Sequence, residues 1–227
     1  RARSLFIPRK GWSLVGGDLK GLELRMLAHY LHPYDGGKYA EVVVDGDVHT
    51  HNQIAMEVET RNKAKGGIYC FLYGGGDAKF GSVIGASAKK GREIKNNLLS
   101  NIPGLRKLID ICKFSSVQNG EVRPFDWRGI PVRSEHAALN TLLQSSGAHI
   151  AKVWTCYADK VLKDKFNGRF AWVANVHDEL QIECEKEIAE ELGREVCRCA
   201  TLAGNFFNCR VKIEADYRVG NNWSETH

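Results

Sequence analysis

The segment over residues 169–185 limits the possible folds of this chain more than any other. Its sequence, RFAWVANVHDELQIECE, alternates apolar and polar residues on both sides of the pair His177 and Asp178. Such alternation is typical of half-buried β-strands, and a short polar break between two alternating runs predicts a tight hairpin. We therefore expect two antiparallel strands here, with Asp178 at the tip of the hairpin.

The remaining elements predict an α+β fold around this hairpin. A strand is expected over residues 11–17, which places Asp18 at its carboxyl end, and a last strand over 209–214. The excursion over 121–133 contains Pro124 and Pro131, which exclude it from the centre of a sheet. Periodicity and capping signals predict helices over residues 19–31, 38–44, 48–58, 60–74, 88–100, 105–118, 135–163 and 186–202.

Composition bounds the class of protein. At 227 residues and 43% hydrophobic content, the chain can form one substantial domain or two small ones. No apolar run approaches the about 20 residues needed to cross a bilayer, and no signal-peptide core follows the start, so we expect a cytoplasmic protein without a membrane partner. The seven cysteines contain no C-x-x-C pair, which favours free thiols. A net charge of +5 fits a nucleic-acid partner, but only mildly.

A stripe of two cations and two aromatic rings lies in the helix predicted over residues 60–74. Its members follow one another at intervals of four: Arg61, Lys65, Tyr69 and Tyr73. With about 1.5 Å of rise per residue the stripe spans roughly 18 Å, enough for the cations to hold a triphosphate while the rings meet a base. The alternative is an amphipathic helix with solvated cations and core aromatics, which the spacing alone favours.

Two aspartates are candidates for metal binding. Asp18 would end one strand and Asp178 would lie in a hairpin turn, and adjacent strands could bring both carboxylates to one edge of a sheet. A pair of divalent ions held by such carboxylates and by substrate phosphates activates an attacking oxygen and stabilises the leaving one, which is phosphoryl-transfer chemistry. Taken singly, each aspartate could equally be a helix cap or a turn residue.

Three short motifs follow one another along the chain: DLKGLELR over residues 18–25, R-x3-K-x3-Y-x3-Y-G over 61–74 and VHDE over 176–179. GDVHT over 46–50 and NTLLQ over 140–144 lie between them. In this order they resemble motifs A, B and C and two further segments of the family-A DNA polymerases, most closely the bacteriophage replicative branch. The resemblance covers nearly the whole chain.

The resemblance implies both a fold and a reaction. It implies a polymerase palm, an antiparallel sheet with helices, over residues 1–30 and 134–227, and helical fingers over 31–133. The implied reaction is template-directed addition of deoxynucleotides to a primer 3′-hydroxyl, with primer-template DNA and dNTP as partners. Two Mg²⁺ ions would be held by Asp18, Asp178 and the backbone carbonyl of Leu19.

The resemblance also implies roles for residues around the nucleotide and the DNA. The phosphates would be held by His49, Arg61 and Lys65. Lys65 would in addition act as a catalytic residue that protonates the leaving pyrophosphate. Glu23 would exclude a ribose 2′-hydroxyl, Tyr69 would pack beside the sugar and base, and Tyr73 would line the pocket of the nascent base pair. Primer and template would be contacted near the minor groove by Asn140, Gln144 and His177.

Family members carry a thumb and an exonuclease or exonuclease-like domain before motif A, and the residues before Asp18 are too few to form them. We therefore expect a split polymerase, made in two pieces or cleaved into them, whose second polypeptide supplies both domains and pairs with the residues up to about Arg9. Such a protein would act in the host cytoplasm during phage infection. The alternatives left open are a single-subunit RNA polymerase, a two-metal nuclease and a non-catalytic nucleic-acid-binding or structural subunit derived from a polymerase.

Overall fold

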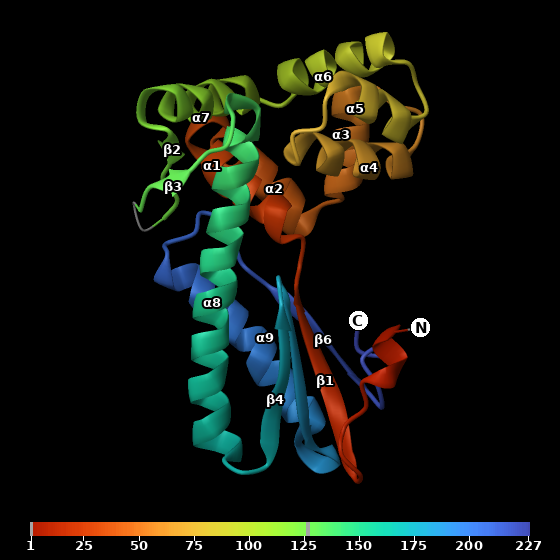
Figure 1. Cartoon of the computed structure of the whole chain (residues 1–227), viewed down its shortest axis with the longest axis vertical. Helices are drawn as coiled ribbons and strands as arrows, with labels where there is room; N and C mark the ends of the chain where they lie inside the picture. Colours follow the sequence, from red (N-terminus) through yellow and green to blue (C-terminus); the bar gives the residue numbers. More distant parts are fainter. Residues whose placement is uncertain (1, 126–127) are drawn as a thin grey trace. The chain divides into compact units, whose positions relative to one another are not determined.

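The chain divides into two compact units in the computed structural model, which describes residues 2–125 and 128–227 (Figure 1). The first unit comprises Arg1–Leu22 and Gly147–His227, and the second comprises Glu23–Ser146. A four-stranded antiparallel sheet with helices forms the first unit, whereas the second is mainly helical. The predicted α+β class is confirmed.

The sheet of the first unit has the strand order β4-β5-β1-β6, and each neighbouring pair is antiparallel. Its strands are β1 (Trp12–Leu19), β4 (Phe170–Val176), β5 (Glu179–Glu185) and β6 (Ala215–Gly220). β4 and β5 form the predicted hairpin, in which His177 adopts a left-handed conformation with φ of 56°. Asp178 follows it in the turn, as the sequence predicts.

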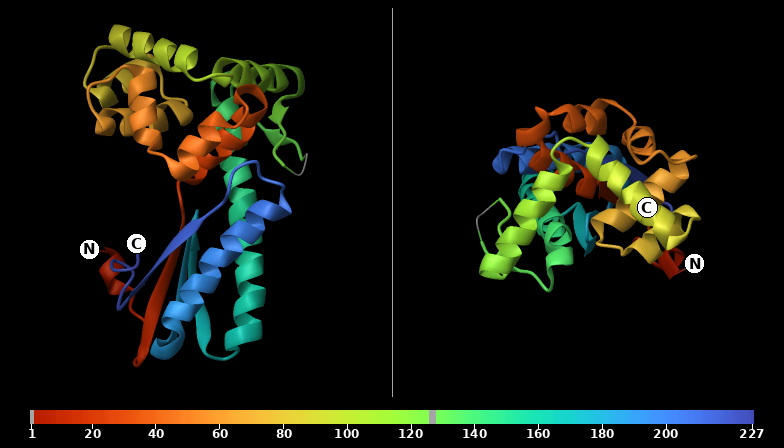
Figure 2. Two further views of the ribbon diagram at one scale, coloured as in Figure 1. Left: turned by 180° about the vertical axis from the view of Figure 1, so that it is seen from behind. Right: turned by 90° about the horizontal axis from the view of Figure 1, so that it is seen from above.

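Helices α8 (Ala138–Phe166) and α9 (Ala189–Phe206) pack against this sheet (Figures 1 and 2). Close approach depends on Gly17 of β1, because a Cβ there would lie 2.8 Å from Cγ1 of Val196 and 3.3 Å from Cζ2 of Trp154. Trp154 is fully buried and donates its Nε1–H to the backbone oxygen of Val196 at 2.8 Å. The core of the first unit therefore lies between β1 and these two helices.

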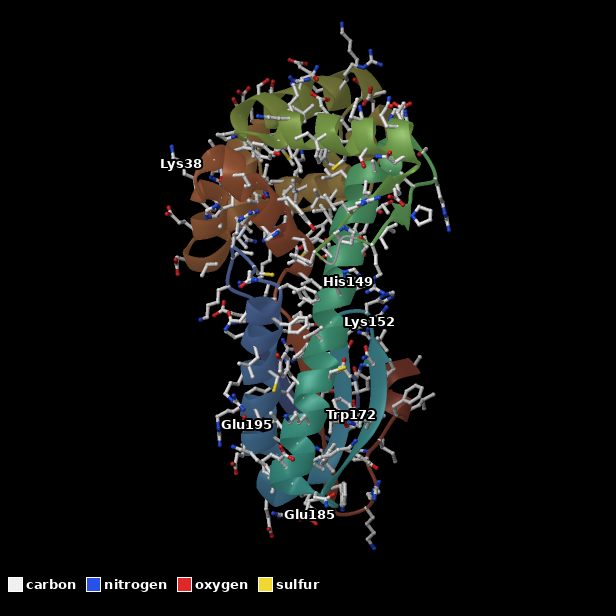
Figure 3. The ribbon with its side chains drawn as sticks, turned by 90° about the vertical axis from the view of Figure 1, so that its left-hand side faces the viewer. Lys38, His149, Lys152, Trp172, Glu185 and Glu195 are labelled. Atoms are coloured by element: carbon white, nitrogen blue, oxygen red, sulfur yellow. The ribbon has the colours of Figure 1, made fainter. Side chains whose placement is uncertain are left out.

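The edge strand β4 is fastened to α8 by its side chains. Trp172, labelled in Figure 3, donates its Nε1–H to Asp159 of α8 at 3.0 Å, and Asn175 donates to the hydroxyl oxygen of Thr155 at 2.9 Å. A bulge between residues 172 and 174 shifts the register between β4 and β5. These bonds hold the edge of the sheet to the helix behind it.

The second unit consists mainly of short helices. They are α1 (Leu22–Asp35), α2 (Lys38–Asp45), α3 (Val48–Met56), α4 (Arg61–Leu72), α5 (Asp77–Ile84), α6 (Ala88–Asn101) and α7 (Leu105–Asn119). The excursion predicted over 121–133 contains a short hairpin of β2 (Glu121–Val122) and β3 (Ile130–Pro131), and its residues 126 and 127 lie outside the described residues. Short 3-10 turns occur at η1 (Ala2–Leu5), at η2 (Glu135–Ala137) before α8 and at η3 (Lys186–Ile188) before α9.

Two glycines let α4 pack closely between its neighbours. A Cβ at Gly67 would lie 3.2 Å from Sδ of Met56 in α3, and a Cβ at Gly66 would lie 3.0 Å from Cγ1 of Val83 in α5. Each glycine costs about 1 kcal/mol of helix propensity relative to alanine. The close contacts with α3 and α5 give the physical reason for glycine at both positions.

One predicted strand was wrong, and one helix was not predicted. The last strand begins at Ala215 rather than at residue 209, and residues 209–214 form no strand. They alternate in hydrophobicity because Val211 and Ile213 are buried, and Ile213 packs against Gly204 of α9. Helix α5 was not expected, because it is short and contains a glycine, Gly81. The structure explains this glycine, since a Cβ at residue 81 would lie 2.6 Å from the backbone oxygen of Ser87.

Replacing Trp154 by alanine is expected to lower the free energy of unfolding by about 3–5 kcal/mol, because the change removes a buried aromatic side chain and its hydrogen bond. Urea unfolding followed by circular dichroism measures the difference. The control is Val173→Ala, since Val173 of β4 is 44% exposed and its truncation should cost less than about 1 kcal/mol. Equal losses for the two variants would contradict a core built on Trp154.

Candidate active site

One end of the four-stranded sheet gathers carboxylates from neighbouring strands. In the antiparallel register, Asp18 of β1 lies opposite Glu179 of β5 on one side and Asp216 of β6 on the other, and directly opposite residues share a face of the sheet. Asp178 lies in the hairpin turn, where its backbone oxygen accepts a hydrogen bond from the N–H of Leu19 at 3.0 Å. The structure thus brings together Asp18, Leu19 and Asp178, the three residues predicted to bind metal.

The crowding of negative charge changes the acidity of Asp18. Its pKa is raised from 3.8 to about 6, first by burial and then by the charges of Asp178 and Glu179. Asp216 adds a smaller effect in the same direction, and His227 opposes it. Ionisation of Asp18 is therefore less favourable in the protein alone than in water, and a proton or a cation at this end of the sheet would relieve the repulsion.

The donor set at this end of the sheet fits a hard divalent cation, because carboxylate oxygens are the ligands that Mg²⁺ prefers. Within residues 2–125 and 128–227, no group of three or more His, Cys, Asp or Glu side chains is arranged to hold a metal ion by itself. An ion bound by Asp18 and Asp178 would thus take further oxygens from the backbone, from water or from a phosphate-bearing substrate.

The end of the chain packs against Glu179, which is only 4% exposed. Its Oε1 accepts hydrogen bonds from Nε1 of Trp223 and from Nε2 of Gln181, and Nδ1 of His227 lies 3.0 Å from Oε2. Sequence reasoning assigned no site role to Glu179, His227 or Asp216. Glu179 could have been predicted as a site residue because it directly follows Asp178 in the sequence. Asp216 could not, because the last strand was expected over residues 209–214.

The predicted stripe lies on α4 in the second unit. Arg61, Lys65 and Tyr69 are helical, and Tyr73 directly follows the last helical residue. The hydroxyl of Thr60 caps the helix by accepting a hydrogen bond from the N–H of Lys63 at 3.3 Å. The helix predicted from the stripe is therefore confirmed, with both cations exposed and Tyr69 half-buried.

His49 of α3 lies beside the cationic end of this stripe. Its ring centroid is 6.2 Å from that of Tyr69, and burial together with the charges of Arg61 and Lys65 lowers its pKa. These effects show that the three groups predicted to hold phosphates share one region of the second unit. Asp47 also reaches this region, where its Oδ2 accepts a hydrogen bond from Nε of Arg61 at 2.8 Å.

Glu23 of α1 connects two other predicted site residues. Its Oε1 accepts a hydrogen bond from the hydroxyl of Tyr73 at 2.8 Å and another from Nε2 of Gln144 at 3.3 Å. Burial, and then the bond to Glu23, raise the pKa of Tyr73 to about 12. Asn140 lies one helical turn before Gln144 on α8, and His177 is exposed in the hairpin turn of the first unit.

The fold of this chain is that of a nucleic-acid polymerase domain. The chain resembles the solved structure "POL domain of Pol1 from M. smegmatis complex with DNA primer-template and dNTP" with a TM-score of 0.85. The match covers 98% of this chain and 42% of that chain at 22% sequence identity, a level that supports the shared fold alone. Among the described residues, no helix has the length and apolar character needed to span a membrane.

Sequence comparison then establishes the family. The model of DNA polymerase family A matches residues 1–225, and the chain belongs to this family, as its motifs predict. It is 38% identical to the DNA-directed DNA polymerases of Enterobacteria phage T3 over 244 residues and of Escherichia phage T7 over 241 residues, with 97% of this chain covered in each case. A third relative, from Escherichia phage Phieco32, is 33% identical over 259 residues and covers all of the chain. The chain spans 34% of the length of the T3 and T7 proteins and 42% of the Phieco32 protein.

The variant Asp18→Asn is expected to change how stability depends on pH. Because the pKa of Asp18 is raised to about 6 in the folded protein from 3.8, the folded state binds more protons than the unfolded state between these values. This carboxyl therefore makes the parent less stable as pH rises through that window. Asparagine cannot ionise, so the variant should gain stability relative to the parent as pH rises from about 4 to 6, and keep the gain above that.

Thermal unfolding in metal-free buffer at several pH values measures this gain. The control Asp164→Asn removes a carboxyl at an exposed site on α8, away from this end of the sheet, and should change the melting temperature little. A gain for Asp18→Asn that is equal at both ends of the window would contradict the raised pKa.

Proposed function

We propose that this chain is the catalytic palm and fingers part of a template-directed DNA polymerase, which adds deoxynucleotides to a primer 3′-hydroxyl by two-metal phosphoryl transfer. The observation that carries the proposal is the pair Asp18 and Asp178, brought together at one end of the central sheet in a chain of family A. In this proposal the palm comprises residues 1–30 and 134–227, and the fingers comprise 31–133.

Asp18, Asp178 and the backbone carbonyl of Leu19 would hold two Mg²⁺ ions. When bound, these ions would lower the pKa of the primer 3′-hydroxyl and neutralise charge on the triphosphate and the departing pyrophosphate. The raised pKa of Asp18 supports this assignment, because a carboxylate that is unfavourable alone becomes favourable beside a cation. The protein's part is to keep both carboxylates at fixed positions on the strand end and the turn.

The incoming triphosphate would be held by His49, Arg61 and Lys65. Arg61 and Lys65 are exposed one turn apart on α4, so both can reach neighbouring phosphate oxygens. The ammonium group of Lys65 would donate a proton to the leaving pyrophosphate as the α-phosphate is attacked. His49, with its lowered pKa, would act as a neutral hydrogen-bond donor.

The sugar and base would meet the aromatic end of the stripe. Glu23 would exclude a ribose 2′-hydroxyl, and its hydrogen bonds to Tyr73 and Gln144 support this role because they hold the carboxylate in one place. Tyr69 would pack beside the sugar and base, and Tyr73 would line the pocket of the nascent base pair. Primer and template would be contacted by Asn140, Gln144 and His177.

The proposed partners are primer-template DNA, dNTP and a second polypeptide with the thumb and exonuclease domains. The solved neighbour from M. smegmatis is a complex with the first two. The second polypeptide stays a prediction. We place the reaction in the host cytoplasm during phage infection. The rival function, a non-catalytic nucleic-acid-binding or structural subunit, predicts DNA binding without synthesis.

Primer extension tests the proposal directly. The purified chain is assayed alone and mixed with any co-purifying polypeptide. The mixture should extend a primer in the presence of Mg²⁺, and Asp178→Ala should lower the rate by about a thousandfold or more. Asp164→Asn, which changes a carboxylate away from the site, should retain the parent's rate. Binding of primer-template DNA without any extension, by the chain and by the mixture, would instead support the non-catalytic subunit.

Tyr69→Phe tests the proposed contact with the sugar. In this family, a tyrosine at this position goes with acceptance of dideoxynucleotides, because its hydroxyl can replace the missing 3′-hydroxyl contact. The variant should therefore raise the ratio of kcat/KM for dNTP to that for ddNTP by about 10-fold to 100-fold, the size of one hydrogen bond to a charged group. As a control, Tyr157→Phe, on α8 in the first unit, should leave the ratio unchanged. An unchanged ratio for Tyr69→Phe would contradict the proposed contact of Tyr69 with the sugar.

A further inference from the structure

The carboxylate of Asp47 accepts several hydrogen bonds near the stripe, although the sequence analysis gave this residue no role. It caps the N-terminus of α3, where its Oδ1 accepts hydrogen bonds from the backbone N–H groups of His49 at 3.0 Å and Thr50 at 3.3 Å. Its Oδ2 accepts another from the hydroxyl of Thr50 at 2.8 Å. These bonds hold the carboxylate rigidly at the start of the helix that carries His49.

The same carboxylate binds Arg61 at the start of α4. Nε of Arg61 donates to Oδ2 of Asp47 at 2.8 Å, so one aspartate ties two helices that each carry a proposed phosphate ligand. Nε is the inner nitrogen of the guanidinium group, and within the described part of the chain the outer Nη groups make no hydrogen bond. The Arg61 side chain is 48% exposed, which leaves its Nη groups open to an external acceptor.

The geometry of the Asp47–Arg61 contact shows whether Asp47 would support phosphate binding by Arg61 or compete with it. A carboxylate that bound both Nη groups would have to leave before a phosphate could bind there. Asp47 binds only Nε, so Arg61 can keep this contact and still offer both Nη groups to a phosphate. Its bonds to Arg61 and Thr50 also lower the pKa of Asp47, so its carboxylate stays ionised at neutral pH.

We propose that Asp47 is a positioning residue for the nucleotide triphosphate: it fixes the guanidinium group of Arg61 from behind and anchors the helix that carries His49. The inference rests on the proposed function, because it assigns a support to the same triphosphate site. It goes further by naming which residue prepares the site before the nucleotide arrives. Preparing Arg61 in advance lowers the conformational entropy lost on binding.

The test is a double-mutant cycle on nucleotide binding. The parent, Asp47→Asn, Arg61→Ala and the double variant are titrated with dATP and Mg²⁺, and the Kd is measured by calorimetry. Asparagine still caps α3 but loses the charge that holds Arg61. Asp47→Asn should raise the Kd by about fivefold or more in the parent background, and by less than about twofold when Arg61 is already alanine.

Two further variants separate positioning from simple folding. Thr50→Val removes one hydrogen bond to Oδ2 while keeping the side-chain volume, and should weaken binding less than Asp47→Asn does. Asp47→Ala removes the cap as well, so its melting temperature should fall below that of Asp47→Asn and its Kd should be at least as high. A role in capping alone would move the melting temperature and leave the Kd of Asp47→Asn at the parent's value.

The remaining outcomes of the dATP titrations either contradict the role of Asp47 or show whether that role and the polymerase activity fail separately. Equal effects of Asp47→Asn in both backgrounds would overturn it, because Asp47 would then not act through Arg61. Tighter binding by Asp47→Asn would also overturn it, since Asp47 would then be a competitor. Suppose that the parent binds dATP and the double-mutant cycle gives the expected Kd values, but no primer is extended. That result would support the role of Asp47 and refute the polymerase activity. A parent that does not bind dATP, either alone or with primer-template DNA and any co-purifying polypeptide, would overturn both.

Discussion

The antiparallel register of β1 is the constraint on which the site of the first unit depends. It places Asp18 opposite Glu179 on one side and Asp216 on the other, while the hairpin turn adds Asp178. Backbone hydrogen bonds on both sides of a central strand leave these carboxylates little freedom to separate. A shift by one residue would turn Asp18 to the other face of the sheet, so register and chemistry cannot change independently.

The same arrangement works against stability in the metal-free protein. Burial and the neighbouring carboxylates together make the ionised form of Asp18 less favourable than in water, and the surrounding packing must offset that cost. Gly17 and Trp154 contribute by allowing α8 and α9 to pack closely on the helix-facing side of the sheet. Beside Asp18, one oxygen of the buried Glu179 accepts hydrogen bonds from Trp223 and Gln181.

In the second unit, carboxylates have a different part: each accepts hydrogen bonds from several groups and so acts as a hub that holds other side chains in place. Glu23 accepts hydrogen bonds from Tyr73 and Gln144, and Asp47 accepts them from the start of α3 and from Arg61. Each hub joins residues that are distant in sequence. Arg61 and Tyr73, two of the side chains proposed to meet a nucleotide, are therefore held by the fold before any nucleotide binds, which helps to make a precise site.

Local pattern by itself determined the hairpin around Asp178, the helix that carries Arg61 and Lys65, and the family, because each depends on residues within a few positions of one another. The tertiary structure alone decided where β6 lies and which groups surround Asp18. Residues 209–214 alternate as a strand would, but they form no strand. Val211 and Ile213 are buried, and Ile213 packs against Gly204 of α9, so the alternation reflects burial rather than strand pairing. Asp216 reaches Asp18, and Asp47 reaches Arg61, only through contacts between distant segments, which no local periodicity encodes.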